Sequence, residues 1–468
     1  MARRDSHRWS LVLWLPVVLV LGLLASAATA YWLGGDQPDP DQDPAAVAPP
    51  EGLALPALST PDPVAEPALG AVDPSKVRRA VAPLLEDDDL GPGVLATIAG
   101  LDGTLLYSTG MGTATPASTL KLVTATAALE TLGPDHTFAT TVVSDAPGRL
   151  VLVGGGDPLL ASEPADRTAY PRVADVVTLA KATAASLEQS GRTRVRLGYD
   201  TSLFSGPEVS PRWPATYVSE GVVSPISALW VDEGRPADDG PGRVDDPSAV
   251  AAGAFAAALT RAGVEVVGAP QQRPAGAGAA ELARVTSPPL SQIVERTLEV
   301  SDNEAAEVLS RHVGLATSHE GSFAAGARGA LHVLEALGVA TDGARVYDGS
   351  GLSRDDLLDP DTLSAVLQAA GAVGHPELRA VVTGLPVAGF NGSLTYRFED
   401  ERLGRGAVRA KTGTLSGVTG LAGTVTDRDG NPMVFALLAD RVALVDTLDA
   451  RDALDAVTSA LAACRCGA

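Results

Sequence analysis

Apolar residues occupy nearly every face of one predicted helix in the first third of the chain. The run from Leu120 to Leu132 consists mainly of Leu, Val, Ala and Thr, and it stops at Gly133-Pro134. Such a distribution is typical of a helix that is buried on all sides. Thr115 and Pro116 precede the run, which predicts a helix cap at Thr115 and the first helical position at Pro116.

Two further helices are predicted on either side of Ser301-Asp302-Asn303. Apolar residues recur at helical spacing between Pro289 and Val300, and a second such run begins at Ala305. The three polar residues therefore lie in a connection between helices. There, short side chains can satisfy loose backbone groups and also point into a cleft.

The C-terminal part of the chain has the pattern of antiparallel strands. β-Branched and small residues fill 407–414, 418–425 and 433–438, and residues 427–430 are typical of a turn. Shorter strand-like segments occupy 137–143, 150–153 and 195–197.

Residues 1–35 have the features of a targeting segment. A basic start is followed by an apolar run from Leu11 to about Leu33 that is long enough to span a bilayer, and Ala28-Thr29-Ala30 fits a signal-peptidase site. We expect a cleaved signal peptide or a retained membrane anchor, with everything after residue 35 exported to the cell envelope. Residues 36–75 are rich in Pro, Asp and Ala and should form a disordered linker.

Composition excludes several classes of protein. The formal net charge of −22 argues against a nucleic-acid partner. The six histidines lack metal-ligand spacing, so neither a metal nor another cofactor is expected. The body after the linker is long for one core and suggests two or three domains. Cys464 and Cys466 could form a disulfide in an exported protein, and the sequence leaves their redox state open.

Lysine is rare in this chain, with four residues against thirty-one arginines, and Lys121 closes the motif Ser118-Thr119-Leu120-Lys121. Ser118 and Lys121 are three residues apart and project from the same helix face. A serine hydroxyl needs a base to become a nucleophile. A desolvated lysine can lose its proton, whereas an arginine cannot. The motif therefore predicts Ser118 as nucleophile and Lys121 as base, at a helix start whose free amides suit an oxyanion.

Two more motifs follow in sequence. In Ser301-Asp302-Asn303, we expect Ser301 to relay a proton to the leaving group and Asn303 to donate hydrogen bonds to the substrate amide and to Lys121. In Lys411-Thr412-Gly413-Thr414, we expect the first two residues to bind a terminal carboxylate and the glycine to let a substrate backbone lie against the strand edge. The backbone amides of Thr414 and Ser118 would form the oxyanion hole. Strict alternation sends Lys411 and Thr412 to opposite faces, so both reach one cleft only on a twisted edge strand.

The three motifs in this order, with 183 residues from Ser118 to Ser301, resemble those of class C low-molecular-mass penicillin-binding proteins. This is the D-alanyl-D-alanine carboxypeptidase/endopeptidase group, peptidase family S13, of the penicillin-binding protein 4 type. The likeness covers roughly residues 76–463 and includes five further stretches, at 152–158, 224–229, 347–354, 385–389 and 392–394. We interpret these five as structural or rim elements.

The resemblance implies an α+β fold with a β-lactamase/transpeptidase-like domain, in which helices flank an antiparallel sheet. Residues 76–140 and 283–468 would form this domain, and residues 141–282 would form one or more inserted domains. The implied activity is serine-type acyl transfer on peptidoglycan stem peptides and cross-links through an acyl-enzyme, with β-lactam antibiotics as covalent inhibitors. Membrane contact would be made only through the N-terminal segment.

Two alternatives come from other functional classes. A class A β-lactamase would carry a Glu-x-x-Leu-Asn segment after Ser-Asp-Asn, and residues 337–343, where it is expected, lack it. A non-catalytic scaffold that binds the cell wall is disfavoured because all three motifs are intact.

Overall fold

The structure is a computed structural model that describes residues 70–468, except for 167, 238–239 and 241. The predicted targeting segment and residues 36–69 of the predicted linker lie outside the described residues. Among the helices of the described part, none is long and apolar enough to cross a bilayer.

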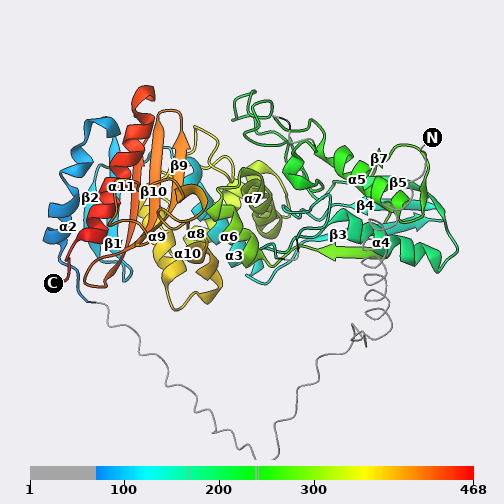
Figure 1. Ribbon diagram of the computed structural model, residues 1–468, viewed down its shortest axis with the longest axis horizontal. Helices are drawn as coiled ribbons and strands as arrows, with labels where there is room; N and C mark the ends of the chain where they lie inside the picture. Colours follow the sequence, from blue (N-terminus) through cyan, green and yellow to red (C-terminus); the bar gives the residue numbers. More distant parts are fainter. Residues whose placement is uncertain (1–69, 167, 238–239, 241) are drawn as a thin grey trace, which may run out of the picture. The chain divides into compact units, whose positions relative to one another are not determined.

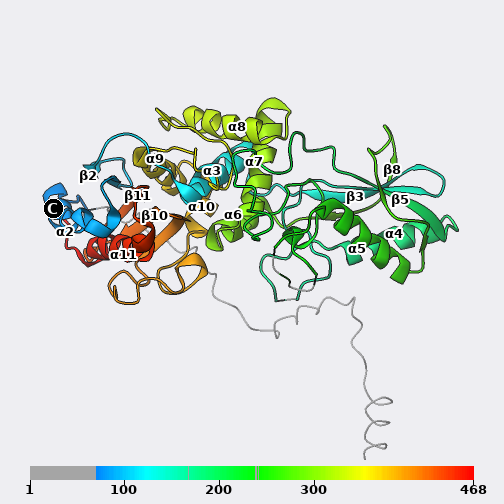
Figure 2. The same cartoon turned by 90° about the horizontal axis from the view of Figure 1, so that it is seen from above.

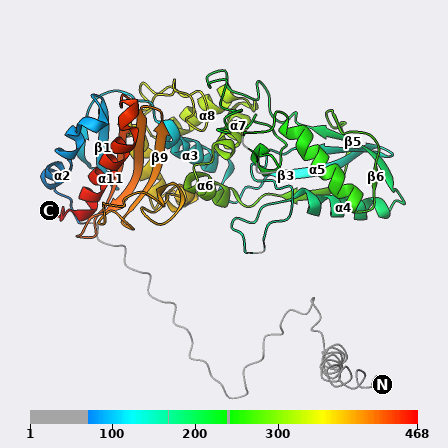
Figure 3. The ribbon, with the colours of Figure 1, turned by 45° about the horizontal axis from the view of Figure 1, so that its top comes forward.

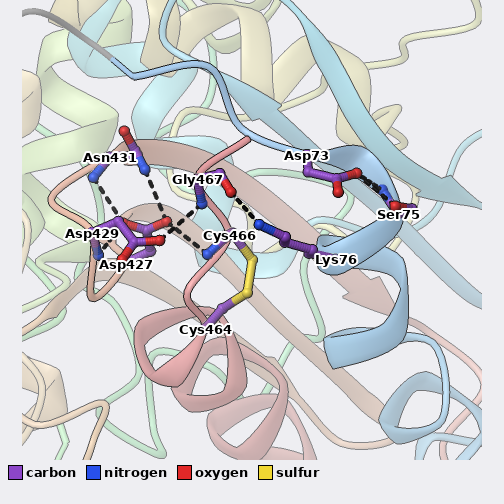
Figure 4. The surroundings of a disulfide bond; sticks show 9 residues. All are labelled: Asp73, Ser75, Lys76, Asp427, Asp429, Asn431, Cys464, Cys466 and Gly467. Atoms are coloured by element: carbon purple, nitrogen blue, oxygen red, sulfur yellow. Dashed lines mark hydrogen bonds between the residues drawn. A yellow bond between two sulfur atoms is a disulfide. The ribbon is translucent and has the colours of Figure 1, made fainter.

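The described chain begins with residues that are tied to its C-terminus. Val72 pairs with Gly467, and Asp73 caps α2 (Pro74–Val81) by accepting a hydrogen bond from the Ser75 amide. The fold therefore starts a few residues before the predicted boundary at residue 76. Cys464 and Cys466 form a disulfide, and Figure 4 shows Lys76 beside it, donating to the Gly467 carbonyl.

The first sheet unites strands from both ends of the described chain. All its neighbours are antiparallel. Its order is β2 (Leu105–Thr109), β1 (Val94–Gly100), β11 (Pro432–Ala439), β10 (Val418–Thr426) and β9 (Val408–Leu415). The three C-terminal strands confirm the predicted pattern, and β9 is an edge strand.

Both faces of this sheet are covered, as the alternation along its central strand β11 requires. Val434, Ala436 and Leu438 belong to one buried cluster, whereas Phe435 and Leu437 belong to the other. Helices α2 and α11 (Thr447–Ala463) pack on the second cluster, and α9 (Pro360–Gly371) packs on the first. Figure 2 shows α9 and α11 on opposite sides of β10 and β11.

Helix α3 (Lys121–Leu132) lies at the centre of the helical layer. Nine of its residues, from Lys121 to Leu129, are buried, which confirms the prediction of an all-round apolar helix. It packs against α9 and four other helices, namely α6 (Leu290–Glu299), α7 (Asn303–Ser318), α8 (Phe323–Ala336) and α10 (Arg379–Thr383).

The predicted start of this helix is wrong. A separate 3-10 turn, η3 (Ala117–Leu120), precedes α3, and Thr115 does not cap it. The Thr115 hydroxyl instead donates to the Arg354 carbonyl at 3.3 Å. The physical reason is Ala117, whose φ of +45° lies outside the range of a right-handed helix.

A second sheet occupies the chain between the first two motifs, from Ala139 to Thr286, where an insertion at 141–282 was expected. Helices α4 (Val176–Glu188) and α5 (Pro247–Arg261) pack on it (Figure 1). Its order is β6 (Glu265–Val266), β5 (Arg194–Asp200), β4 (Arg149–Val153), β3 (Ala139–Ala146) and β8 (Ala280–Thr286), and β7 (Gln271–Gln272) also pairs with β5. The architecture as a whole is α+β, as predicted.

Candidate active site

Ser118 lies in η3, which packs directly against the edge strand β9. Figure 3 shows β9 next to α3, the helix that follows this turn. A left-handed conformation at a non-glycine residue such as Ala117 costs about 1–3 kcal/mol, so the surrounding packing must hold the turn. The neighbouring loop is close enough for this, because a Cβ on Gly351 would come within 1.9 Å of the Ala117 carbonyl oxygen.

Lys121 is completely buried and makes three hydrogen bonds, one for each proton of an ammonium group. Its Nζ donates to Ser118 Oγ at 2.9 Å, to Asn303 Oδ1 at 2.8 Å and to the Ser350 carbonyl at 2.8 Å. Burial lowers the pKa of this amine to about 8, and nearby carboxylates, chiefly Glu307, oppose the shift. A substantial fraction of the amine is therefore neutral near physiological pH.

The second motif forms the turn between α6 and α7. Ser301 adopts a φ of +60°, and the Asp302 carboxylate caps α7 by accepting the Ala305 amide at 2.9 Å. Asn303 accepts a hydrogen bond from Lys121 through Oδ1, while its Nδ2 donates to the Val222 carbonyl at 3.0 Å. The prediction that Asn303 donates to Lys121 is therefore wrong, because an ammonium has no acceptor to offer.

Asp302 is supported by a buried cluster of charged side chains. One carboxylate oxygen from each of Glu233, Asp302 and Glu304 lies within 4.8 Å of the others. Burial and the charge of Glu233 raise the pKa of Asp302 well above its usual range. Arg235 and Arg243 pair with Glu233 and Glu304, at 2.7 and 2.8 Å, so that the cluster does not accumulate negative charge.

Lys411, on β9, is also completely buried. Its Nζ donates to Ser301 Oγ at 2.8 Å and to the Thr412 carbonyl at 2.9 Å. Burial and the positive charge of Lys121 both lower its pKa, to well below its usual range. The hydrogen bond from Lys411 to Ser301 thus connects the third motif to the second. The hydrogen bond from Lys121 to Asn303 connects the first motif to the second in the same way.

The remaining residues of the third motif, Thr412 to Thr414, alternate along β9 between more exposed and buried positions. Thr412 Oγ1 donates to Ser393 Oγ at 3.0 Å, on η6 (Gly392–Leu394), and Thr414 is exposed. Gly413 is buried against η3, where a Cβ would lie 2.5 Å from the Pro116 carbonyl oxygen. The glycine is therefore required for packing against the Ser118 turn, a reason that the sequence did not show. Its role beside a substrate backbone stays a prediction.

Sequence reasoning missed the groups that orient the motifs. The Ser350 and Val222 carbonyls bind Lys121 and Asn303, Ser393 binds Thr412, and Glu307 holds the turn that contains Ser350. Ser350 and Ser393 belong to stretches that we had interpreted as structural or rim elements. Glu307 gave one usable signal, since it is an acidic residue four positions after Asn303 on a helix rich in apolar residues.

This arrangement defines a class of enzyme. A serine hydroxyl bonded to a buried lysine of lowered pKa, with a second serine–lysine pair nearby, is suited to acyl transfer through a covalent intermediate. The comparison with known proteins agrees with the geometry. The family model described as "D-Ala-D-Ala carboxypeptidase 3 (S13) family" matches residues 77–238 and 241–462, and the chain belongs to this family.

Individual relatives lead to the same assignment. The carboxypeptidase DacB of Mycolicibacterium smegmatis is 35% identical over 466 residues, which is 96% of each chain. A D-alanyl-D-alanine carboxypeptidase of an Actinomadura species is 32% identical over 78% of this chain and 81% of its own.

Solved structures confirm the fold. Penicillin-binding protein 4 of Haemophilus influenzae matches with a TM-score of 0.64 and 21% identity, over 80% of this chain and 94% of its own. The same protein has also been solved in complex with a β-lactam, and this structure matches with a TM-score of 0.59.

Proposed function

We propose that this member of family S13 is a serine D-Ala-D-Ala carboxypeptidase that cleaves the terminal alanine from peptidoglycan stem peptides. The observation that carries the proposal is the 2.9 Å hydrogen bond between Lys121 Nζ and Ser118 Oγ, in a site where burial lowers the lysine pKa to about 8. The two relatives that are named carboxypeptidases support this reaction class.

The first step forms the acyl-enzyme. The neutral Lys121 amine accepts the proton of Ser118, and the serine Oγ attacks the carbonyl carbon of the penultimate D-alanine. The backbone amides of Ser118 and Thr414 are proposed to stabilise the oxyanion. The peptide bond to the last D-alanine then breaks.

The departing amine needs a proton, and Ser301 is proposed to supply it. Lys411 donates to the Ser301 hydroxyl at 2.8 Å, so it can replace the proton that Ser301 gives up. A water molecule then attacks the ester carbonyl and gives up one proton to the Ser301–Lys411 pair, which restores the proton that Lys411 had supplied. Lys121 passes its proton back to Ser118 Oγ as the ester bond breaks. The enzyme returns to its starting state.

The free carboxylate of the last D-alanine is proposed to bind at β9. Lys411 offers a cation and Thr412 a hydroxyl, and Thr412 is partly exposed. A carboxylate near Lys411 would stabilise the ammonium form that burial disfavours. Substrate binding would therefore charge the residue that replenishes Ser301.

Two extensions of the activity follow from the same chemistry. A cross-link between stem peptides presents the same D-alanyl carbonyl, so endopeptidase action would differ only in the amine that leaves. A β-lactam presents a strained amide with a carboxylate nearby, and should acylate Ser118. The complex of the Haemophilus protein with a β-lactam supports the second extension.

The location is proposed from the sequence. The substrate class lies outside the cytoplasm, and the apolar run from Leu11 to about Leu33 would export the chain. N-terminal sequencing of the protein from cells distinguishes a cleaved signal peptide from a retained anchor.

The test of the activity is mass spectrometry of muropeptides incubated with the full chain. Loss of one alanine from a pentapeptide is expected, and opening of cross-linked dimers would reveal endopeptidase action. Ser118→Ala should abolish both, together with labelling by a fluorescent penicillin. Rapid turnover of penicillin without action on muropeptides would instead identify a β-lactamase, and a wild-type protein inert in both assays would identify a scaffold.

A further inference from the structure

Glu307 is a buried acidic residue of α7 that belongs to none of the three motifs. It lies one helical turn after Asn303, so the two side chains share a helix face. Its side chain is completely buried. A buried carboxylate is costly unless its oxygens are satisfied, and here each oxygen has a backbone donor.

Those two donors belong to a single turn. Oε2 of Glu307 accepts the Gly349 amide at 2.9 Å, and Oε1 accepts the Ser350 amide at 2.8 Å. Thr124 of α3 donates to the Gly349 carbonyl at 2.7 Å, and Asp348 accepts the Gly351 amide at 2.7 Å. The peptide groups on both sides of Ser350 are therefore held in place, and so is the Ser350 carbonyl that binds Lys121.

The position of this carbonyl matters when Lys121 acts as a base. A neutral amine has two protons and one lone pair, whereas the ammonium has three protons. Ser350 O and Asn303 Oδ1 are acceptors with no proton to give, so each binds one of the two N–H groups. The lone pair is then left for the third direction, toward Ser118 Oγ.

We propose that Glu307 is a positioning residue for acyl transfer, an inference that rests on the function proposed above. By fixing the Ser350 turn, Glu307 aims the lone pair of the Lys121 amine at the Ser118 hydroxyl. Asn303 performs the same task from the first turn of the same helix. One face of α7 thus orients Lys121 in two ways, directly through the Asn303 side chain and indirectly through Glu307, which holds the Ser350 carbonyl in place.

The charge of Glu307 acts on the same amine. Among the carboxylates that raise the pKa of Lys121, Glu307 has the largest effect, followed by those of Asp348, Asp302 and Glu304. Lys411 is the positively charged side chain that interacts with Lys121, and the charge of Lys121 lowers the pKa of Lys411. Burial raises the pKa of Glu307, and the charge of Asp348 adds to the rise, whereas the two backbone amides that Glu307 accepts favour its ionised form. Its charge also interacts with Arg311 and Asp356.

The test is the rate of acylation by a fluorescent penicillin as a function of pH, measured on the full chain. Wild type is compared with Glu307→Gln, Glu307→Asp and the control Asp356→Asn. Asp356 is also completely buried and accepts one backbone amide, that of Tyr347 at 2.8 Å, in the same loop. It therefore controls for the loss of a buried carboxylate in this loop that does not accept the Gly349 and Ser350 amides.

Glu307→Gln removes the charge that favours the ammonium form, and its side-chain NH2 group cannot accept the second backbone N–H as a carboxylate oxygen does. The midpoint of the acylation profile should shift to lower pH by about one unit, and the plateau should fall about 10-fold to 100-fold because the base is misdirected. Glu307→Asp keeps the charge on a shorter side chain, so its midpoint should stay near that of wild type while its plateau falls. If Glu307→Gln fails to fold, Glu307→Asp carries the test.

An unchanged midpoint in Glu307→Gln, with a plateau no lower than that of Asp356→Asn, overturns the positioning role and leaves the proposed function intact. A Glu307→Asp variant whose plateau equals that of wild type also overturns the positioning role and leaves the proposed function intact. A wild-type protein that takes up no label overturns the proposed function itself, and the role of Glu307 with it.

Discussion

Lys411 donates a hydrogen bond of 2.8 Å to Ser301 Oγ, and this lysine shares its buried site with Lys121. The two amines have different electrostatic surroundings. Four carboxylates raise the pKa of Lys121 against burial, whereas burial and the charge of Lys121 act together to lower that of Lys411. In the substrate-free site, no carboxylate thus offsets the effect of burial on Lys411 in the way that Glu307 does for Lys121, whereas the carboxylate role predicted for Lys411 requires its cationic form.

Replacing each lysine by arginine should separate their roles. Lys121→Arg should reduce acylation by a fluorescent penicillin at least about 1,000-fold, because arginine stays charged and cannot act as a base. Lys411→Arg should leave a measurable remainder, since a guanidinium can still bind a carboxylate. The exposed Lys181→Arg is the matched control and should label like wild type. Equal losses from the two buried lysines would contradict this division.

Gly413→Ala should impair the reaction more than it impairs the fold. The new Cβ would lie 2.5 Å from the Pro116 carbonyl oxygen and would push the Ser118 turn away from β9. A displacement of this kind typically costs about 100-fold in rate. The control is Gly420→Ala, on the paired strand, whose Cβ would meet the flexible end of Leu438 at 3.1 Å.

Labelling rates and thermal melting curves check this prediction together. Gly420→Ala should retain most of its labelling rate, and both variants should melt within a few degrees of wild type. A Gly413→Ala protein that labels at the wild-type rate would show that η3 and β9 need no close contact.

The Asp157 carboxyl group should make stability depend on pH. Burial raises its pKa from 3.8 to about 7, and its Oδ2 has no hydrogen-bond partner among the described residues. The folded pKa exceeds the unfolded one, so the group stabilises the fold at low pH and this stabilisation is lost as pH rises toward 7. Asp157→Asn should remove about 3 kcal/mol of the decline in unfolding free energy between about pH 5 and about pH 8.

Urea denaturation at the two pH values measures that difference. The exposed Asp342→Asn serves as the control, and its decline should match that of wild type. An Asp157→Asn decline as steep as that of wild type would rule out a buried neutral carboxyl group at this position.

The Cys464–Cys466 disulfide should contribute to stability and leave the chemistry unchanged. The residues around it are bound from two sides, because the Asp73 amide donates to the Cys466 carbonyl at 2.8 Å and the Arg428 amide donates to the Cys464 carbonyl at 2.9 Å. Replacing both cysteines by serine frees the unfolded chain of a small ring, which should cost about 2 kcal/mol. Urea denaturation should show this loss, and a labelling rate below that of wild type would contradict the separation from the active site.

The sequence predicted the elements that carry chemistry because their signals are local. Ser118 and Lys121 are three residues apart, and Ser301 to Asn303 lie between two amphipathic runs. Their convergence with Lys411, more than a hundred residues further along, could be inferred only from the order of the motifs. Strand alternation had required Lys411 and Thr412 to lie on an edge strand if both were to reach one cleft, and β9 is an edge strand.

The remaining errors have physical causes that a sequence does not display. The Ser350 and Val222 carbonyls are backbone atoms, so no residue type marks them. The role of Gly413 depends on the approach of Pro116, which is almost three hundred residues away. Ala117 gave no warning of its positive φ, because tertiary packing and not local propensity imposes that conformation.

The pairing of the first described residues with the last has a mechanical consequence. Ala71 accepts the Ala468 amide at 2.7 Å, and Asp73 donates to Cys466, so a force applied to the chain ahead of residue 70 meets this seam first. The load would pass into residues 464–468 and into the β10–β11 turn, where Asp427 and Asp429 accept the Cys466 and Gly467 amides. Tension on the chain ahead of residue 70 would thus reach these terminal hydrogen bonds before it reaches Ser118, and an extension fused to Ala468 would weaken them.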